Sequence, residues 1–331
     1  MKDTFKAYEL TAQDDKATGA FKTMTIDDLP EGDVLIDVHY SSINFKDALA
    51  TNPRSKVIKD YPIIPGIDAA GVVAQSDHPS FEEGDEVVVT GYELGVSHDG
   101  GFSEYVRVPG DWAVKVPKDL TLEEAMVFGT AGFTAALSIQ RLEDSGIAVD
   151  KGPVLVRGTS GGVGSLALMM LSELGYKVTA STSHDELKDD MKKFGAKDVI
   201  SRITSDSSKP LEKGVWQGVI DPVGGETLGE VIKTVKPNGG IALSGNASGA
   251  KFESTVLPFI LRGIKLLGID SVYCDMKMRE RLWRRLATDL KPEFLHDIKT
   301  VVPFEELESG LEKLKDHKVY GRMVVKMPNK S

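Results

Sequence analysis

The chain has 331 residues, enough by the usual length prior for two domains with hydrophobic cores. Its formal net charge of −10 and a sequence pI near 5.2 argue against nucleic acid or an anionic membrane as a general partner. Cys274 is the one cysteine, so an internal disulfide is impossible and a thiolate zinc site is nearly excluded. Residues 1–10 lack an apolar signal core and residues 125–139 are too short to span a bilayer, so we expect a cytoplasmic protein.

The first third of the chain predicts a β-rich domain. Apolar and polar residues alternate over 34–43, 69–76 and 85–92, and Pro, Gly and Asp separate these runs. Five prolines between residues 62 and 117 interrupt the pattern further. This composition is typical of a compact, partly open β-barrel.

From about Leu122 the pattern changes to alternating helix and strand. Residues 122–146 predict a helix with one glycine-containing break. Short apolar runs then recur, separated by helical segments or loops, as in a doubly wound parallel sheet. We therefore expect domains over 1–121 and 122–295, with 296–331 returning to the first domain as helix, turn and strand. The apolar runs are 196–201, 218–225, 239–245 and 264–270.

The stretch RGTSGGVGSLAL, residues 157–168, joins a predicted strand to a predicted helix that ends at Gly175. With the strand 176–181 it forms a βαβ unit, whose helix N-terminus offers N–H groups and a positive dipole end to a pyrophosphate. The spacing is not the strict G-x-G-x-x-G, so an ordinary glycine-rich turn is the alternative. The context favours a dinucleotide site formed by Ser160, Gly161, Gly162, Val163 and Gly164.

The end of the second strand of this unit bears on the choice of dinucleotide. NAD-binding folds usually place Asp or Glu there to bind the ribose 2′-OH. This chain has Ser181, Thr182, Ser183 and His184 instead. Hydroxyls and an imidazole suit a 2′-phosphate, so we expect NADPH, with Arg202 after the next strand as a second phosphate ligand. An ordinary polar loop and a solvated arginine are the alternatives.

The order of these segments resembles the medium-chain dehydrogenase/reductase superfamily. Several motifs resemble its acrylyl-CoA reductase and YhdH-type quinone oxidoreductase branch. The resemblance implies an α/β fold with a GroES-like, β-rich, partly open barrel domain and a doubly wound Rossmann domain, NADP(H) as the cofactor and a small-molecule substrate. The motifs are SSINFKDALA, YPIIPGIDAAGVV, HDGGFSEYVRVPGDW, FGTAGFTAALSIQRLEDSG, LPFILRGIKLLGIDSV and WRRLATDL.

The superfamily's zinc enzymes hold their catalytic metal with two Cys and one His. The matching positions here are Asn44, Ile67 and Thr130. Since zinc needs thiolate, imidazole or carboxylate ligands, the resemblance implies a zinc-free member.

The resemblance also implies roles for the residues of INFKD. Asn44 would orient the substrate or the nicotinamide, and Phe45, where the branch commonly has Tyr, would lie near the cofactor. Lys46 and Asp47 would form a pair that fixes the loop, and a structural ion pair without a chemical role is an equal alternative. Tyr92 is a candidate proton donor or a pocket wall.

Other positions resemble the nicotinamide-facing edge of the family. Thr130 and Thr134 would contact the nicotinamide, unless Thr134 is a helix cap. Arg322 would approach the cofactor from the returning strand, unless it forms a surface salt bridge. Asn246, Ile260 and Ser271 would line the cofactor.

We therefore expect an NADPH-dependent, zinc-free ene reductase that acts on small α,β-unsaturated carbonyl compounds, with acrylyl-CoA as the leading substrate. The alternatives are an NADPH:quinone oxidoreductase and, from another class, an NADPH-binding sensor or structural protein with little turnover. The basic segment 277–285 either binds CoA phosphates or forms a solvated helix face. The run 264–270, if it is an edge strand, predicts a homodimer.

Overall fold

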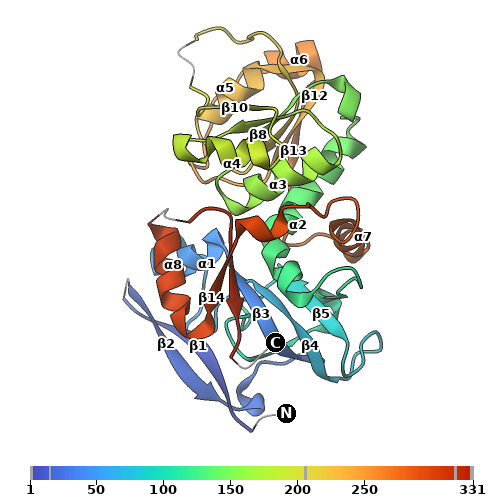
Figure 1. The fold of residues 1–331 in the computed structure, drawn as a ribbon. Helices are drawn as coiled ribbons and strands as arrows, with labels where there is room; N and C mark the ends of the chain where they lie inside the picture. Colours follow the sequence, from blue (N-terminus) through green and yellow to red (C-terminus); the bar gives the residue numbers. More distant parts are fainter. Residues whose placement is uncertain (1–2, 15, 205–206, 317–318, 329–331) are drawn as a thin grey trace. The chain divides into compact units, whose positions relative to one another are not determined.

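The computed structural model describes residues 3–14, 16–204, 207–316 and 319–328. Its internal contacts divide the chain into two compact units, whose elements are labelled in Figure 1. Unit 1 consists of Met1–Thr130, Val272–Ala287 and His296–Ser331, and unit 2 of Ala131–Ser271 and Thr288–Leu295. The chain thus returns to unit 1 twice, and the segment Val272–Ala287 groups with the β-rich unit.

Unit 1 is organised around strand β3 (Val34–Ile43), which occupies the centre of a seven-stranded sheet. It pairs antiparallel with β4 (Asp68–Ser76), β6 (Tyr105–Val108) and β15 (Arg322–Lys326). The alternating runs of the first third are therefore strands, and the tail does return to this sheet. The remaining strands are β5 (Glu86–Thr90), β7 (Ala113–Lys115) and β14 (Lys299–Pro303), with a separate hairpin of β1 (Phe5–Gln13) and β2 (Lys16–Met24).

Three helices lie wholly within unit 1. They are α1 (Phe45–Ala50), α7 (Met276–Leu286) and α8 (Leu307–Lys315). Apolar residues from β3 and its neighbours form the core, which Leu307 and Leu311 of α8 extend.

Short 3-10 helices occur in both units. They cover Ile26–Asp28, Pro53–Ser55, Gly110–Trp112, Val149–Lys151, Asp185–Leu187, Leu295–Ile298 and Phe304–Glu306.

Unit 2 contains a six-stranded, fully parallel sheet in the order β10-β9-β8-β11-β12-β13. This is the doubly wound order, and it confirms the expected Rossmann-type sheet. The strand order reverses between β8 and β11, so the crevice at their carboxyl ends is the expected ligand site. The strands are β8 (Val154–Arg157), β9 (Val178–Ser181), β10 (Asp198–Ile200), β11 (Trp216–Asp221), β12 (Val235–Leu243) and β13 (Lys265–Gly268); the helices are α3 (Gly162–Glu173), α4 (Lys188–Lys193), α5 (Thr227–Lys233) and α6 (Leu257–Arg262).

Helix α2 (Leu122–Asp144) contains the predicted glycine break. Gly129 has φ 49° and ψ −154°, far from helical values, so two helical segments meet there. A Cβ atom on Gly129 would lie 2.4 Å from Oδ2 of Asp68 and 2.8 Å from Nη2 of Arg322. Only glycine therefore fits, because both the backbone angle and the neighbouring polar groups exclude a side chain.

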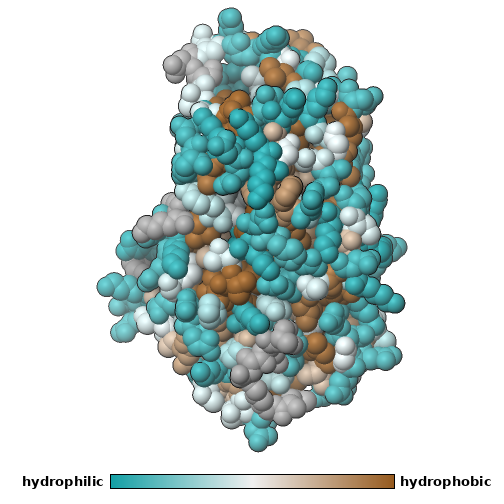
Figure 2. Space-filling model, viewed as in Figure 1, coloured by the Kyte–Doolittle hydropathy of each residue, from teal (hydrophilic) through white to brown (hydrophobic). Residues whose placement is uncertain are grey.

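Within the described residues, no helix is long and apolar enough to cross a membrane. On the face drawn in Figure 2, hydrophilic side chains predominate and hydrophobic ones form separate patches. This surface agrees with the high content of charged residues, 27% of the chain.

We expect Gly129→Ala to destabilise the protein by at least about 2 kcal/mol, because it adds a clash with Asp68 to the strain of a left-handed backbone. Gly84→Ala is the matched control, since Gly84 also has a positive φ of 93° but a Cβ atom added to it would meet nothing within 4 Å. The control should lose about 1 kcal/mol. Thermal melting of both variants measures the difference, and equal losses would show that the Asp68 contact is unimportant.

Candidate active site

The side chain of Asp68 lies at the centre of a buried polar cluster in unit 1. Its carboxylate accepts hydrogen bonds from Nδ2 of Asn44 at 2.8 Å, from the backbone N–H of Thr130 at 3.0 Å, and from the hydroxyls of Ser42 and Thr130. The antiparallel pairing of β3 with β4 places the end of β3, where Ser42 lies, beside Asp68 at the start of β4. The Gly129 break turns the N–H of Thr130 toward the same carboxylate.

Arg322, the first residue of the returning strand β15, completes this cluster. Its guanidinium donates to Oδ1 of Asn44 at 3.1 Å, to Oγ of Ser42 at 2.8 Å and to the carbonyl of Val127 at 2.9 Å. It also lies 3.9 Å from Asp68. Burial lowers the pKa of Arg322, and the charge of Asp68 opposes this shift. Arg322 is 3% exposed, so the surface salt bridge considered from the sequence is wrong.

Asp47 is a second buried carboxylate, and it acts on the backbone. Its Oδ2 accepts from the N–H of Asn44 at 2.8 Å, and its Oδ1 accepts from the N–H of Ile67 at 3.0 Å. Asn44 is the N-cap of α1, so Asp47 completes a capping box. Burial raises the pKa of Asp47 to about 7, while the hydrogen bond from Asn44 opposes the rise.

These contacts test whether the site fits zinc. Asn44 and Thr130 are bonded to Asp68, and the N–H of Ile67 is bonded to Asp47. None of the three supplies the ligands that zinc prefers, and the described residues contain no group of three or more His, Cys, Asp or Glu able to hold a metal ion. The residues therefore do not fit a catalytic zinc, and a metal-free enzyme stays our prediction.

Lys46 and Asp47 do not form the predicted pair. No ion pair joins them in the part of the chain that the structure describes, and Asp47 is buried whereas Lys46 is half-exposed. The pKa of Glu93 is lowered, first by a hydrogen bond from Ser97 and least by the charge of Lys46. Phe45, the neighbour of Lys46, is exposed.

Tyr92 follows β5 in a left-handed conformation, with φ 52°. Its ring stacks on Trp112, with 5.5 Å between centroids, and the guanidinium of Arg279 lies 4.7 Å from its centroid. Arg279 is buried and donates to the carbonyls of Thr90 and Val272. Tyr92 is thus firmly held, and no hydrogen bond to its hydroxyl occurs among the described residues.

The basic segment 277–285 forms most of α7, and its cations differ in exposure. Arg279 is held against Tyr92, whereas Lys277, Arg281 and Arg284 are exposed. Arg284 lies 3.9 Å from Glu280. Asp275 is the N-cap of α7, accepting from the N–H of Met278 at 3.0 Å, which gives this acidic residue a structural role.

In unit 2, glycine-rich loops cover the carboxyl ends of β8, β11 and β12. A Cβ on Gly164 would lie 2.3 Å from the carbonyl of Gly158, and one on Gly225 would lie 2.7 Å from that of Ser248. Helix α3 starts after the N-cap Gly161, which provides no side-chain cap. Its first N–H groups are therefore suited to an anion, and the residues fit a dinucleotide pyrophosphate. The five predicted residues lie at this junction: Ser160 and Gly161 precede the helix, and Gly162, Val163 and Gly164 form its first turn.

Sequence reasoning missed a buried ion pair below these loops. Arg157, the last residue of β8, contacts the carboxylate of Asp221 and the hydroxyl of Thr227. The other oxygen of Asp221 accepts from the N–H groups of Val223 at 2.8 Å and Gly224 at 2.9 Å. Asp68 was missed as well. In both cases the available signal was an acidic residue within a strongly apolar run.

The four residues at the end of β9 differ in accessibility. Ser181 and Thr182 are buried, Ser183 is exposed and His184 is partly exposed. Arg202 is exposed two residues beyond β10, which pairs with β9. The predicted phosphate-reading group therefore presents Ser183, His184 and Arg202, while Ser181 and Thr182 support the turn.

The other predicted cofactor positions of unit 2 are placed as follows. Oγ1 of Thr134 donates to Oγ of Ser271 at 2.9 Å, so two of them are together. Asn246 is exposed in the loop after β12, where its carbonyl accepts from Gly249. Ile260 lies on α6 and is 69% exposed.

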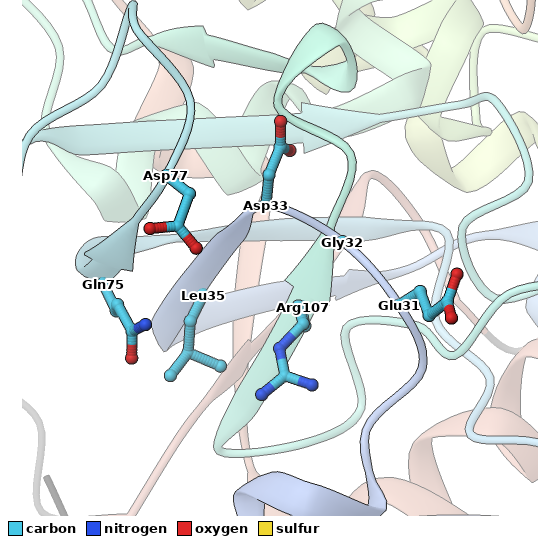
Figure 3. A pocket seen from close by; sticks show the side chains of 7 residues that line it. All are labelled: Glu31, Gly32, Asp33, Leu35, Gln75, Asp77 and Arg107. Atoms are coloured by element: carbon cyan, nitrogen blue, oxygen red, sulfur yellow. The ribbon is translucent and has the colours of Figure 1, made fainter.

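Unit 1 also has a surface hollow of about 300 Å³, which shares no residue with the Asp68 cluster. Figure 3 shows its side chains pointing in different directions, with Arg107 turned away from Asp33 and Asp77. Asp33 accepts from the N–H of Gly110 at 2.6 Å, and Arg107 donates to the carbonyl of Leu29 at 3.3 Å. These groups are occupied with local structure, so we assign this hollow no chemistry.

We expect the stability of the protein to decrease as the pH rises from about 4 to about 7. The folded-state pKa of Asp47, about 7, lies above the unfolded value of about 3.9, so the fold favours the protonated form. This contribution is roughly 2–4 kcal/mol and is lost as the pH rises through the folded pKa. The amide in the Asp47→Asn variant cannot ionise, so the free energy of unfolding of this variant should lose this component of its dependence on pH. Urea unfolding across the range measures it, with the exposed Asp60→Asn as control; equal slopes in all three proteins would contradict the assignment.

Comparison with known proteins agrees with this architecture. Residues 30–118 match the alcohol dehydrogenase GroES-like domain, and residues 162–288 match the family described as zinc-binding dehydrogenase. The crystal structure of Bacillus subtilis protein YhfP with NAD bound is 48% identical, with a TM-score of 0.96, covering 98% of this chain and 100% of that one. Escherichia coli K-12 YhdH with bound NADPH is 42% identical, with a TM-score of 0.93, covering 97% and 99%.

A curated relative extends the comparison to a named activity. The acrylyl-CoA reductase AcuI of Ruegeria pomeroyi is 42% identical over 313 residues, which are 94% of each chain. The chain belongs to the medium-chain dehydrogenase/reductase superfamily of oxidoreductases, within the branch that contains YhfP, YhdH and AcuI.

Proposed function

We propose that this protein is an NADPH-dependent ene reductase that transfers hydride to the β-carbon of a small α,β-unsaturated carbonyl compound. The observation that supports the proposal most strongly is the Asp68 cluster. Two of the three positions matching zinc ligands belong to this cluster, with the Asn44 amide and the Thr130 hydroxyl held by Asp68, while the Ile67 N–H at the third is held by Asp47. Such a site favours a reaction whose developing charge is stabilised by hydrogen-bond donors.

The cofactor site of the proposal lies on unit 2. The N–H groups at the start of α3 bind the pyrophosphate, and the Asp221 turn fixes the adjacent loop. Ser183, His184 and Arg202 surround the position of the 2′-phosphate, and Thr134 with Ser271 contacts the nicotinamide half. When bound, NADPH supplies the hydride. The two related crystal structures contain different dinucleotides. We therefore infer the preference for NADPH from the residues at the end of β9 in this chain.

The residues of unit 1 handle the substrate in this proposal. Hydride addition at the β-carbon moves the alkene π electrons toward the carbonyl, which becomes an enolate, and a proton then adds at the α-carbon. The amide of Asn44, whose orientation Asp68 and Arg322 fix, positions the carbonyl oxygen. The candidate donors with unshared hydrogen-bonding capacity in the described contacts are the Tyr92 hydroxyl and the Lys46 ammonium. The exposed cations of α7 could bind phosphates, which favours a thioester substrate whose carrier bears phosphates. Acrylyl-CoA is the leading substrate.

We expect NADPH oxidation with acrylyl-CoA to have a specificity constant at least about tenfold larger than with a simple quinone. The reason is that the site offers directional donors for one carbonyl oxygen, whereas a quinone requires mainly an open apolar surface. Initial rates of NADPH absorbance loss measure both. Preference for the quinone would favour a quinone oxidoreductase, and tight NADPH binding without turnover on a broad panel would favour a sensor or structural protein.

Asn44→Leu is the informative variant in this assay. It should lower the specificity constant for acrylyl-CoA by about 10²–10³-fold and change the dissociation constant for NADPH little, because the proposed pyrophosphate and 2′-phosphate contacts belong to unit 2. Unchanged turnover in this variant would remove Asn44 from the substrate site. Ser183→Ala provides the opposite control. It alters the proposed cofactor site on unit 2, so it should change the dissociation constant for NADPH.

We further propose that the protein is a homodimer that pairs through unit 2. Strand β13 forms an edge of the parallel sheet, and Val256, Ile260 and Leu261 on or beside α6 are 64–69% exposed. An open strand edge beside exposed apolar side chains favours pairing with a second copy.

Light scattering should give twice the chain mass of 35.9 kDa. Ile260→Lys should shift the protein to monomer, because burying the new charge at an interface is costly. Val301→Lys, at an exposed apolar residue of unit 1, should remain dimeric. A wild-type monomer would overturn the proposal.

A further inference from the structure

The turn after β9 presents a single side chain whose charge ordinarily changes near neutral pH. Of the four residues predicted to read a 2′-phosphate, Ser181 and Thr182 are buried. The hydroxyl of Ser181 points to the carbonyl of Ser201 at 3.4 Å, and that of Thr182 accepts from the N–H of His184 at 3.0 Å. Discrimination by charge on this turn therefore depends on the imidazole of His184.

The imidazole already has an anionic partner. Its Nδ1 lies 3.2 Å from Oε1 of Glu186, which is in the 3-10 helix Asp185–Leu187. The two side chains are 31% and 62% exposed, and an ion pair at such an exposed site contributes little stability. A dianionic phosphate can therefore displace the Glu186 carboxylate from a protonated His184, whereas a ribose hydroxyl has no charge with which to compete.

Other charged groups lie on this turn and on the elements next to it. On the same turn, Asp185 is bound by Lys188 at 2.8 Å. At the neighbouring strand, Arg202 carries a charge that stays constant across the relevant pH range. Helix α3, which starts at the adjacent loop, has no titratable residue over 162–171. Asp189 and Asp190 begin α4 and are exposed.

We propose that the pair His184–Glu186 makes the choice between NADPH and NADH dependent on pH, with NADPH favoured more strongly as the pH falls through the range in which histidine ordinarily gains its proton. This inference rests on the proposed cofactor site, and it assigns Glu186 as a specificity-determining residue that competes with the 2′-phosphate.

The test is the ratio of dissociation constants for NADH and NADPH, measured by fluorescence titration without substrate between about pH 6 and 8. In the wild type this ratio should be roughly three- to tenfold larger at the acidic end. His184→Lys should keep the ratio high at the alkaline end, because lysine remains charged. His184→Gln should give a low ratio at both ends.

The 2′-phosphate itself loses part of its charge near pH 6, by analogy with other phosphate monoesters, where the second pKa is about 6. His184→Lys retains that titration and lacks the imidazole, so the difference between it and the wild type isolates His184. Glu186→Gln should raise the ratio most at acidic pH. Asp189→Asn removes the same charge from the exposed start of α4 and should leave the ratio unchanged.

The outcomes separate the two proposals. If His184→Gln keeps the pH dependence of the wild type, or if Glu186→Gln and Asp189→Asn have equal effects, this inference is overturned while the cofactor proposal stands. If the wild type binds neither dinucleotide at any pH, the proposed function itself fails and the inference fails with it.

Discussion

A carboxyl group buried in a protein interior needs hydrogen-bond partners around it, and Asp68 imposes this constraint on unit 1. Its donors come from the end of β3, from the cap of α1 and from α2 after its break. The left-handed Gly129 follows from the same requirement, because only a kinked helix can present the Thr130 N–H there. Arg322 ties the last strand to the cluster, so residues far apart in the chain become mutually fixed.

Unit 2 also has a buried carboxylate that holds backbone N–H groups, at the ends of β8 and β11. Asp221 holds a turn through two backbone N–H groups and pairs with the buried Arg157. In both units the carboxylate positions backbone rather than meeting solvent. Polar groups fixed before a ligand arrives do not have to reorganise during the reaction, which is the physical basis of electrostatic preorganisation.

The two units respond to pH for different reasons. Asp47 is enclosed, so the proton equilibrium of this residue is coupled to folding, and its raised pKa is reflected in stability. His184 is partly exposed and lies beside the Glu186 carboxylate, and in our proposal its charge acts on a ligand instead. Burial thus decides whether a titratable group acts on the fold or on recognition.

The sequence by itself determined the two-part architecture, the parallel sheet, the glycine loop after β8 and the break in α2. These features depend on periodicity, on apolar runs and on glycine, which are local properties of the chain. It also indicated Asn44, Thr130 and Arg322, through resemblance to a family. Only the tertiary structure brought these three side chains together, because the residue that joins them, Asp68, is marked in sequence only as an acidic residue within an apolar run, which does not reveal its partners.

Other assignments needed the fold for the same reason. The predicted partner of Lys46 was wrong, since the Asp47 carboxylate binds N–H groups that include one twenty residues away. The basic segment 277–285 reads as one cationic surface in sequence, yet Arg279 is buried against Tyr92. Which hydroxyls at the end of β9 reach solvent was likewise decided by strand pairing. Hydrogen-bond satisfaction and burial are set by residues distant in the chain, so local patterns cannot specify them.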